Sequence, residues 1–259
     1  MPTSTYSHIP SVVQYLIATR PNSILDVGLG NGKMGFIARD LLDVMLGERF
    51  KKADWKIKID GLEVFPEYVQ AHQKAIYDDI FIGDAFDTID KTGKYDMIIV
   101  GDVLEHFEKQ RAWLFLDKCA AHCNAYIMLN IPIGEGWIQG DIYGNIHETH
   151  LSFWKFEEFE PFTTEKALYE FPGIGHYGAL LIKKDDYINF RAGKGPTTHI
   201  GELHPDILAE YSVVESLILE KKLLEAIRKL RDIIAMFPEE ANNAKLYMER
   251  ISALMEQIR

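Results

Sequence analysis

Four carboxylates stand at or directly after apolar segments that we expect to form buried strands: Asp26, Glu63, Asp84 and Asp102. The carboxyl ends of parallel strands meet at one edge of an open α/β sheet, and sheets of this type bind their ligands there. A single strand-end acid can equally cap a helix or begin a turn. Because all four occur in successive segments of one chain, we expect them to surround a common ligand.

The glycines that directly follow the first of these acids are Gly28, Gly30, Gly32 and Gly35. A nucleoside triphosphate is disfavoured, because the first and third glycines are one residue too close for a P-loop and Met34 replaces its magnesium-binding hydroxyl. A dinucleotide is also disfavoured, although residues 30–35 satisfy G-x-G-x-x-G. The acid that binds its ribose is expected about 20 residues on, and Glu63 comes 33 residues after Gly30.

S-adenosylmethionine is the third candidate, and it carries a sulfonium, an ammonium and a carboxylate but no phosphate. An acid beside a glycine turn suits this ligand, because a carboxylate can face the ammonium directly or through water. The pattern Asp26-x-Gly28-x-Gly30-x-Gly32 after an apolar strand resembles the first motif of class I S-adenosylmethionine-dependent methyltransferases.

Later segments resemble further motifs of that family, in the same order along residues 10–184. Glu63 in "GLEVF" is similar to the acid that bridges both ribose hydroxyls of the donor. Asp84 in "GDAF" is similar to the residue that binds the adenine amino group. Residues 95–106, "YDMIIVGDVLEH", resemble the fourth motif. The "DVLEH" part and "ETHLSFWKFEEF", residues 148–159, are similar to the small-molecule branch that includes ubiquinone-biosynthesis O-methyltransferases and sugar-tailoring enzymes.

The resemblance implies S-adenosyl-L-methionine as cofactor and methyl transfer to a small molecule, with a hydroxyl of a sugar or of a phenolic or quinone precursor as acceptor. The cofactor-binding residues it implies are Asp26, Gly28, Gly30, Asn31, Gly32, Glu63, Val64, Asp84, Ala85, Asp102 and Val103. Two alternatives stay open at this point. One is an NAD(P)-dependent oxidoreductase on the same type of sheet, and the other is a non-catalytic scaffold that binds the donor.

Three histidines are candidates for acid–base chemistry. An oxygen acceptor usually needs its proton removed, and histidine suits that task near neutral pH. Resemblance and position favour His150, and then His106, as the catalytic base, while a purely structural role is the alternative for each. His147 and His150 form an H-x-x-H pair near Asp102 and Glu105, but nothing supplies a tight ligand set, so we expect no metal.

The loop that covers residues 133–145 is the feature most informative about the acceptor, because it is long and rich in glycine and aromatic residues. Its glycines would let it move as a lid. Trp137 and Tyr143 can stack on a ring, and the side chains that can accept hydroxyl hydrogens are Asp141, Asn145 and Glu148. The expected substrate-binding residues are Trp137, Tyr143, His147 and Tyr6, the last from an amino-terminal helix that also contains His8.

Apolar strand patterns alternate with helical ones through the first two thirds of the chain. This alternation predicts a doubly wound, mostly parallel α/β sheet, and two closely spaced strand patterns at 166–171 and 178–184 predict an antiparallel strand near its end. A helix is expected at 153–162. We assign 1–185 to the methyltransferase domain, 186–202 to a linker, and 203–259 to a helical extension that serves as a dimerisation or docking arm.

The composition narrows the class of protein further. The 259 residues carry a net charge of −11, which disfavours nucleic acid as a partner because phosphates require clustered Lys and Arg. The sequence shows neither a secretory signal pattern nor an apolar run of about 18 residues, so we expect a cytoplasmic protein without membrane contact. Cys119 and Cys123 are expected to be buried thiols within one helix. One-sided apolar stripes in the extension favour a homo-oligomer, a dimer in the simplest case.

Overall fold

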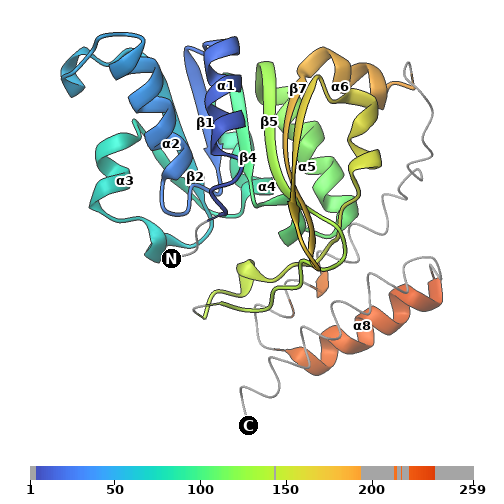
Figure 1. Cartoon of the computed structure of the whole chain (residues 1–259). Coiled ribbons are helices and arrows are strands. Elements are labelled where there is room, and N and C mark those ends of the chain that lie inside the picture. Colours follow the sequence, from blue (N-terminus) through green and yellow to red (C-terminus); the bar gives the residue numbers. More distant parts are fainter. Residues whose placement is uncertain (1–3, 143, 194–212, 215–216, 218–221, 237–259) are drawn as a thin grey trace.

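The computed structural model describes residues 4–142, 144–193, 213–214, 217 and 222–236, and its main body is a sheet with helices on both faces (Figure 1). The strands are β1 (Ser23–Val27), β2 (Lys58–Glu63), β3 (Ile80–Ile82), β4 (Tyr95–Gly101), β5 (Cys123–Ile133), β6 (Glu165–Phe171) and β7 (Gly175–Lys183). The α-helices are α1 (Ile9–Thr19), α2 (Lys33–Ala38), α3 (Ala71–Ile76), α4 (Ala85–Thr88), α5 (Lys109–His122), α6 (Lys184–Arg191) and α8 (Leu223–Met236).

The seven strands lie in the order β3-β2-β1-β4-β5-β7-β6. The first five are parallel, whereas β7 runs antiparallel to both β5 and β6. The hairpin between β6 and β7 is short, which only an antiparallel pair allows. The prediction of a mostly parallel, doubly wound sheet with an antiparallel strand near its end is confirmed.

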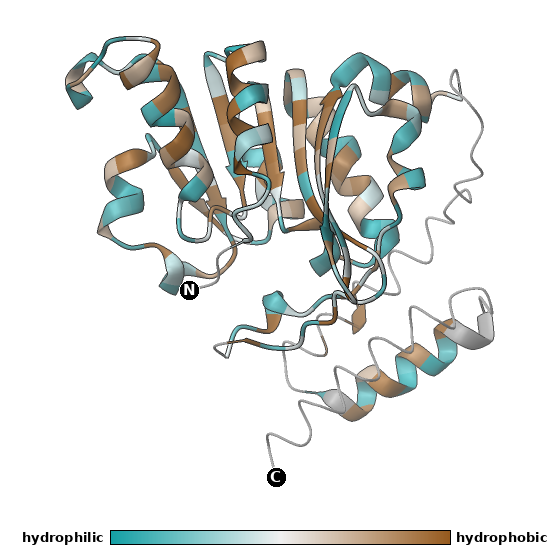
Figure 2. Cartoon of the chain, viewed as in Figure 1, coloured by the Kyte–Doolittle hydropathy of each residue, from teal (hydrophilic) through white to brown (hydrophobic). Residues whose placement is uncertain are grey.

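Successive residues of the central strands face opposite sides of the sheet and enter two separate cores. Ile98 and Val100 pack with α5 on one side, and Met97 and Ile99 pack with α1 and α2 on the other. All four side chains are fully buried. Figure 2 shows the sheet as predominantly hydrophobic, as expected of parallel strands covered on both faces.

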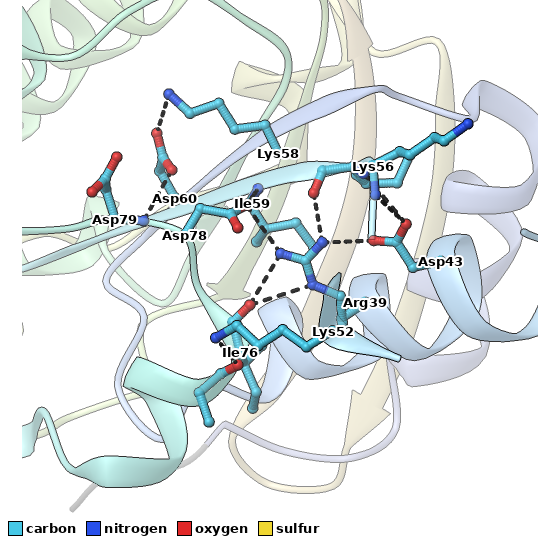
Figure 3. A network of polar contacts seen from close by, with 12 residues as sticks. Arg39, Asp43, Lys52, Lys56, Lys58, Ile59, Asp60, Ile76, Asp78 and Asp79 are labelled. Carbon is cyan, nitrogen blue, oxygen red and sulfur yellow. Dashed lines mark hydrogen bonds and ion pairs between the residues drawn. The ribbon is translucent and has the colours of Figure 1, made fainter. Parts of the chain in front are cut away.

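A π-helix, Arg39–Met45, continues α2 and is tied to the sheet by a buried guanidinium (Figure 3). The Arg39 guanidinium donates to the carbonyl oxygen of Ile57 at 2.5 Å. It also pairs with Asp43 at 2.6 Å and with Asp78 at 3.0 Å. Because α2 begins directly after the glycine-rich turn, this anchor holds the carboxyl side of that turn against β2.

The helix expected at 153–162 is absent from the structure. Two separate 3₁₀ turns, Phe156–Glu158 and Glu160–Phe162, occupy this segment. Proline at 161 supplies no N–H and disfavours helical geometry in the residue before it. The buried ring of Phe162 then holds the second turn against the core.

The expected domain boundary at residue 185 is too early, because α6 continues the domain to Arg191. Its Tyr187 is buried and donates to the Asp117 carboxylate of α5 at 2.8 Å. Arg191 pairs with the same carboxylate at 2.7 Å. The remainder of the expected linker lies almost entirely outside the described residues.

Both cysteines are buried and free, as expected of structural thiols. Cys119 lies in α5, whereas Cys123 is the first residue of β5 and not part of that helix. The two residues therefore do not share a helical face.

Within the extension at 203–259, only α8 and a few residues before it are described. Ala226, Leu230 and Ile233 of α8 are fully buried, while Leu224 is exposed. Figure 2 shows hydrophobic and hydrophilic residues alternating along this helix, which fits the predicted one-sided stripe. No helix in the described part of the chain has both the length and the apolar character that a membrane span requires.

Candidate functional site

A cavity of about 340 Å³ opens at the carboxyl ends of β1, β2, β4 and β5. It is lined by ten of the eleven residues predicted to bind the cofactor: Asp26, Gly28, Gly30, Asn31, Glu63, Val64, Asp84, Ala85, Asp102 and Val103. Trp137, His106, His147 and His150 also line it. The structure thus brings the predicted donor and acceptor residues into one cavity.

Two predicted residues that the structure describes, Gly32 and Tyr6, do not line this cavity. Gly32 is the N-cap of α2 and has φ +78°. Tyr6 is 70% exposed, and its ring lies 4.3 Å from the ammonium of Lys33, which does line the cavity. Tyr143 lies outside the described residues. His8 is fully buried against Tyr177 and does not line the cavity, and burial lowers its pKa to about 4.

The glycine turn between β1 and α2 requires left-handed backbone at Gly28, whose φ is +70°. A Cβ added at Gly28 would come within 2.5 Å of Cγ2 of Val103. Its N–H donates to the carbonyl oxygen of Leu62 at 2.9 Å, which ties the turn to the end of β2. The close approach brings two cavity-lining residues from different strands together.

Replacing Gly28 by alanine is therefore expected to destabilise the domain. The left-handed backbone alone costs a non-glycine residue roughly 1–2 kcal/mol, and displacement of Val103 adds to that cost. Thermal unfolding should show the loss as a melting temperature lower by roughly 2–4 °C per kcal/mol. Gly93→Ala is the matched control, because Gly93 has nothing within 4 Å of an added Cβ. Equal melting temperatures for the two variants would contradict the argument.

Asp26 lies beneath the glycine turn and is almost completely buried. Its Oδ2 accepts hydrogen bonds from the Tyr77 hydroxyl at 2.5 Å and from the N–H of Gly35 at 3.2 Å. Burial raises the pKa of Asp26 to about 7, the two hydrogen bonds oppose that rise, and Glu63 contributes repulsion. Asp26 therefore holds the turn to α2 and places a titratable carboxyl at the cavity wall.

The raised pKa of Asp26 predicts a pH-dependent contribution to stability. Between about pH 4 and 7 the folded chain keeps a proton on Asp26 that the unfolded chain has lost, so stability falls as the pH rises through this window. Above about pH 7 the contribution of Asp26 to stability no longer changes with pH. Tyr77 and Glu63 are the titratable groups that act on Asp26.

Urea unfolding of the wild type and of Asp26→Asn at several pH values checks this expectation. The difference in unfolding free energy, wild type minus variant, should fall from pH 5 to 7 and then stay constant. A difference that does not change with pH would show that Asp26 titrates normally.

Glu63 at the end of β2 is buried, and both of its carboxylate oxygens accept backbone N–H groups. Oε2 accepts from Gly30 at 2.9 Å, and Oε1 accepts from Phe65 at 3.0 Å. Burial raises its pKa, and these hydrogen bonds oppose that rise. Glu63 thus connects the glycine turn of β1 to the loop after β2.

Asp84 caps the start of α4, whereas a turn was the alternative expected for it, and it also lines the cavity. Its Oδ1 accepts from the N–H of Phe86 at 2.8 Å, at the start of α4. The same oxygen pairs with the guanidinium of Arg111 from α5 at 3.1 Å. These contacts hold the carboxylate in a fixed position at the cavity edge.

Asp102 follows β4 in a left-handed conformation with φ +51°, which is uncommon for a residue other than glycine. Its Oδ1 accepts from the hydroxyl of Tyr177 at 2.7 Å, and that hydroxyl also hydrogen-bonds the Ser4 hydroxyl at 2.9 Å. Lys33 donates to the carbonyl oxygen of Ser4 at 2.7 Å. The amino-terminal segment is thereby held at the cavity by residues of α2, β4 and β7.

Three histidines, His106, His147 and His150, line the same cavity. The rings of His106 and His150 are 5.0 Å apart. Nδ1 of His106 lies 3.1 Å from the carbonyl oxygen of Thr149, and Nδ1 of His150 lies 2.6 Å from that of Trp137. A carbonyl accepts only, so each Nδ1 carries the proton in the neutral ring and Nε2 is the basic nitrogen. Burial lowers the pKa of His150.

Two further acidic groups, Glu148 and Glu105, line the cavity. Glu148 hydrogen-bonds the side-chain amide of Asn145 at 3.2 Å, and burial raises its pKa to about 7. Glu105 is 1% exposed, and burial raises its pKa well above the usual range. The indole N–H of Trp137 is buried and has no hydrogen-bond partner among the described residues, so it is a donor available to a ligand.

Sequence reasoning missed several residues that shape the site. Tyr77 packs against Gly35, where an added Cβ would lie 2.3 Å from its ring. Gln73 is fully buried and donates to the carbonyl oxygens of Gly30 and Tyr68. Both come from the segment between β2 and β3, and neither their type nor their spacing marks them before the fold is known.

Several solved structures with a similar fold are methyltransferases. Magnesium protoporphyrin IX methyltransferase from Synechocystis PCC 6803, with bound S-adenosylhomocysteine (SAH), is 17% identical to this chain and has a TM-score of 0.47. The match covers 71% of this chain and 89% of that protein. TehB from Haemophilus influenzae is 12% identical to this chain and has a TM-score of 0.48. The match covers 69% of this chain and 63% of TehB. Human N-acetylserotonin methyltransferase, in complex with S-adenosylmethionine, is 16% identical to this chain and has a TM-score of 0.45. The match covers 68% of this chain and 51% of the human protein.

No protein-family model matches the sequence, and no curated protein matches it either. The class that the chain's own fold defines is a Rossmann-like α/β domain with a ligand cavity at the carboxyl ends of its strands. What that cavity binds has to be argued from its residues.

Proposed function

We propose that this chain transfers a methyl group from S-adenosylmethionine to a hydroxyl of a small molecule. The observation that carries the proposal is the pair of buried carboxylates, Asp26 and Glu63, on either side of one glycine turn in one cavity. A pyrophosphate in that turn would lie against two acidic groups and would oppose the ionisation of both. The ammonium and the ribose hydroxyls of S-adenosylmethionine are instead donors that carboxylates can accept.

The donor fits the cavity with its ribose at Glu63 and its adenine toward Asp84. An ionised carboxylate has about four lone-pair sites, so the two oxygens that hold Gly30 and Phe65 can also accept the ribose hydroxyls. Oδ1 of Asp84 is engaged by Phe86 and Arg111, which leaves Oδ2 for the adenine amino group.

The apolar walls of the adenine position come from Val64, Ala85 and Val103, which all line the cavity. Asp26 and Asp102 lie toward the amino-acid end of the donor in this arrangement. The Asn31 side chain stands at the turn itself and hydrogen-bonds the ring of His72. These residues bind and orient the donor without taking part in bond breaking.

The acceptor is placed at the histidine end of the cavity, between Trp137 and the rings of His106 and His150. An aromatic wall, an available indole N–H and several acceptor oxygens suit a ring that carries hydroxyl groups, such as a sugar or a phenol. In-line transfer needs the acceptor oxygen close to the methyl carbon and shielded from water. His147 also lines this part of the cavity.

A donor with a deuterated methyl group tests the reaction directly. The full chain is incubated with it and with panels of simple phenols, catechols and monosaccharides, and products are analysed by mass spectrometry. We expect a product that carries the deuterated methyl group on oxygen, together with equimolar SAH. Donor binding without such a product in any panel would favour the scaffold alternative.

We further propose that the extension at 203–259 is an oligomerisation arm, because its sequence carries one-sided apolar stripes and Leu224 of α8 is exposed. Deleting residues 203–259 is expected to change the oligomeric state or to cause aggregation. Light scattering of the full chain and the deletion variant measures this. The same number of subunits per particle in both would show that the arm is not the interface.

A further inference from the structure

Glu105, His106 and His150 form a cluster that the methyl donor does not use. The atoms through which these side chains would bind a metal all lie within 4.8 Å of one another. Glu105 and His106 belong to the 3₁₀ turn Leu104–His106 after β4, and His150 comes from the segment that follows the acceptor loop. All three line the cavity at its acceptor end.

The two chain segments of this cluster are fastened to each other through their backbones. The carbonyl oxygen of Glu105 accepts from the N–H of Leu151 at 2.7 Å and from that of Ser152 at 3.1 Å. The Ser152 hydroxyl donates to the carbonyl oxygen of Leu104 at 3.3 Å. These hydrogen bonds therefore fix the segment that contains Glu105 relative to the segment that contains His150.

The carboxylate of Glu105 has no hydrogen-bond partner among the described residues, although it is 1% exposed. A buried carboxylate is costly unless it is paired or coordinates a metal. The charged groups that act on it are Asp102 and Glu148, both acidic. An unpartnered carboxylate among acids attracts a cation.

Each histidine makes the hydrogen bond that is typical of a metal-binding imidazole. A metal-binding imidazole usually donates its other N–H to a backbone carbonyl or a carboxylate, which fixes the ring. Nδ1 of His106 meets the Thr149 carbonyl, and Nδ1 of His150 meets the Trp137 carbonyl. In both rings Nε2 is then the ligand atom. The rings are inclined at 63° to each other, so they are not stacked.

We propose that Glu105, His106 and His150 bind a divalent first-row transition-metal cation. Two imidazoles and one carboxylate suit Zn²⁺, Fe²⁺, Mn²⁺ or Co²⁺, whereas Mg²⁺ and Ca²⁺ prefer oxygen ligands alone. Three protein ligands leave coordination positions open toward the acceptor end of the cavity. The expectation that the chain holds no metal is replaced by this proposal.

The role of the cation in the reaction rests on the proposed function. An acceptor hydroxyl that coordinates the cation loses its proton to solvent water more readily, because the positive charge stabilises the oxyanion. A lone pair of that oxygen then forms the new bond to the donor methyl carbon. The carbon–sulfur bond breaks, and its electron pair stays on sulfur, which becomes the thioether of SAH. The cation thus replaces a histidine as the means of activating the hydroxyl.

Metal titration tests the site without any need for the acceptor. The full chain is stripped with a chelator and titrated with ZnCl₂ by calorimetry and with CoCl₂ by visible absorption. We expect binding of one equivalent and absorption bands from bound Co²⁺. Glu105→Gln and His150→Gln should each weaken Zn²⁺ binding by at least about tenfold, since loss of even an outer-shell partner costs roughly 10–100-fold.

Glu170→Gln and His176→Gln are the matched controls, because both side chains are exposed on the β6–β7 hairpin. They should bind Zn²⁺ as the wild type does. Zn²⁺ should also raise the melting temperature of the wild type but not of Glu105→Gln. That variant replaces a buried carboxyl group that has no hydrogen-bond partner among the described residues, so its metal-free form should be about as stable as the wild type.

Zn²⁺ affinity that is equal in the wild type, Glu105→Gln and His150→Gln would overturn the proposal, and so would the absence of binding. SAH titrated into the same preparations separates this test from that of the proposed function. Metal binding without SAH binding would support the metal site and rule out the proposed methyltransferase function.

Discussion

Replacing Glu63 by alanine is expected to weaken SAH binding by about 1.5–3 kcal/mol, the range for hydrogen bonds that involve a charged group. The proposed ribose contacts would be lost with the carboxylate. The N–H of Gly30, which Glu63 accepts at 2.9 Å, would also lose its partner, and the glycine turn would be less well ordered for the donor. Isothermal titration calorimetry measures the change as a dissociation constant.

Two further variants distinguish ribose binding from general damage to the site. Glu67→Ala removes an exposed carboxylate four residues away and should leave the dissociation constant unchanged. Glu63→Gln keeps one acceptor oxygen, so its dissociation constant for SAH should lie between those of Glu63→Ala and the wild type. If Glu63→Ala binds SAH as tightly as the wild type does, Glu63 is not the ribose ligand.

Replacing His150 by glutamine is expected to lower turnover by roughly 10²–10⁴ and to leave donor affinity nearly unchanged. We place His150 beside the proposed acceptor and Glu63 and Asp84 beside the proposed donor, so the loss of His150 should affect the hydroxyl and not the donor. The size of the effect holds whether His150 removes the proton itself or binds the cation that makes the hydroxyl acidic. Metal content separates these two roles.

His106→Gln is expected to behave in the same way, and His176→Gln serves as the neutral control. A histidine that only orients the acceptor loop would instead raise the Michaelis constant of the acceptor with little change in turnover. Full turnover in both His106→Gln and His150→Gln would exclude either histidine from the chemistry. Methyl transfer would then depend on proximity and on an acceptor that is already a nucleophile.

The sheet could be predicted from the sequence because its central strands are buried on both faces and are therefore continuous apolar runs. Residues 95–101 and 123–133 are examples. The strand-end acids could be located for the same reason, since parallel strands place their carboxyl ends at one edge. The prediction of one cavity for Asp26, Glu63, Asp84 and Asp102 followed from topology alone.

The packing around those acids could not be predicted, because it depends on partners far away in the sequence. Tyr77 reaches Asp26 across 51 positions, and Tyr177 reaches Asp102 across 75. The expected helix at 153–162 failed because the burial of Phe159 and Phe162 and the presence of Pro161 outweighed its helical pattern. Glu105 drew little attention in the sequence, since only the fold shows that its carboxylate is buried without a partner.

Binding of SAH and of NADH to the full chain, measured side by side by isothermal titration calorimetry, tests the central claim most directly. We expect SAH to bind at one site per chain, NADH not to compete with it, and Glu63→Ala to weaken SAH binding. Tight binding of NADH at the same cavity, with no heat of binding from SAH, would contradict the account and assign the cavity to a dinucleotide.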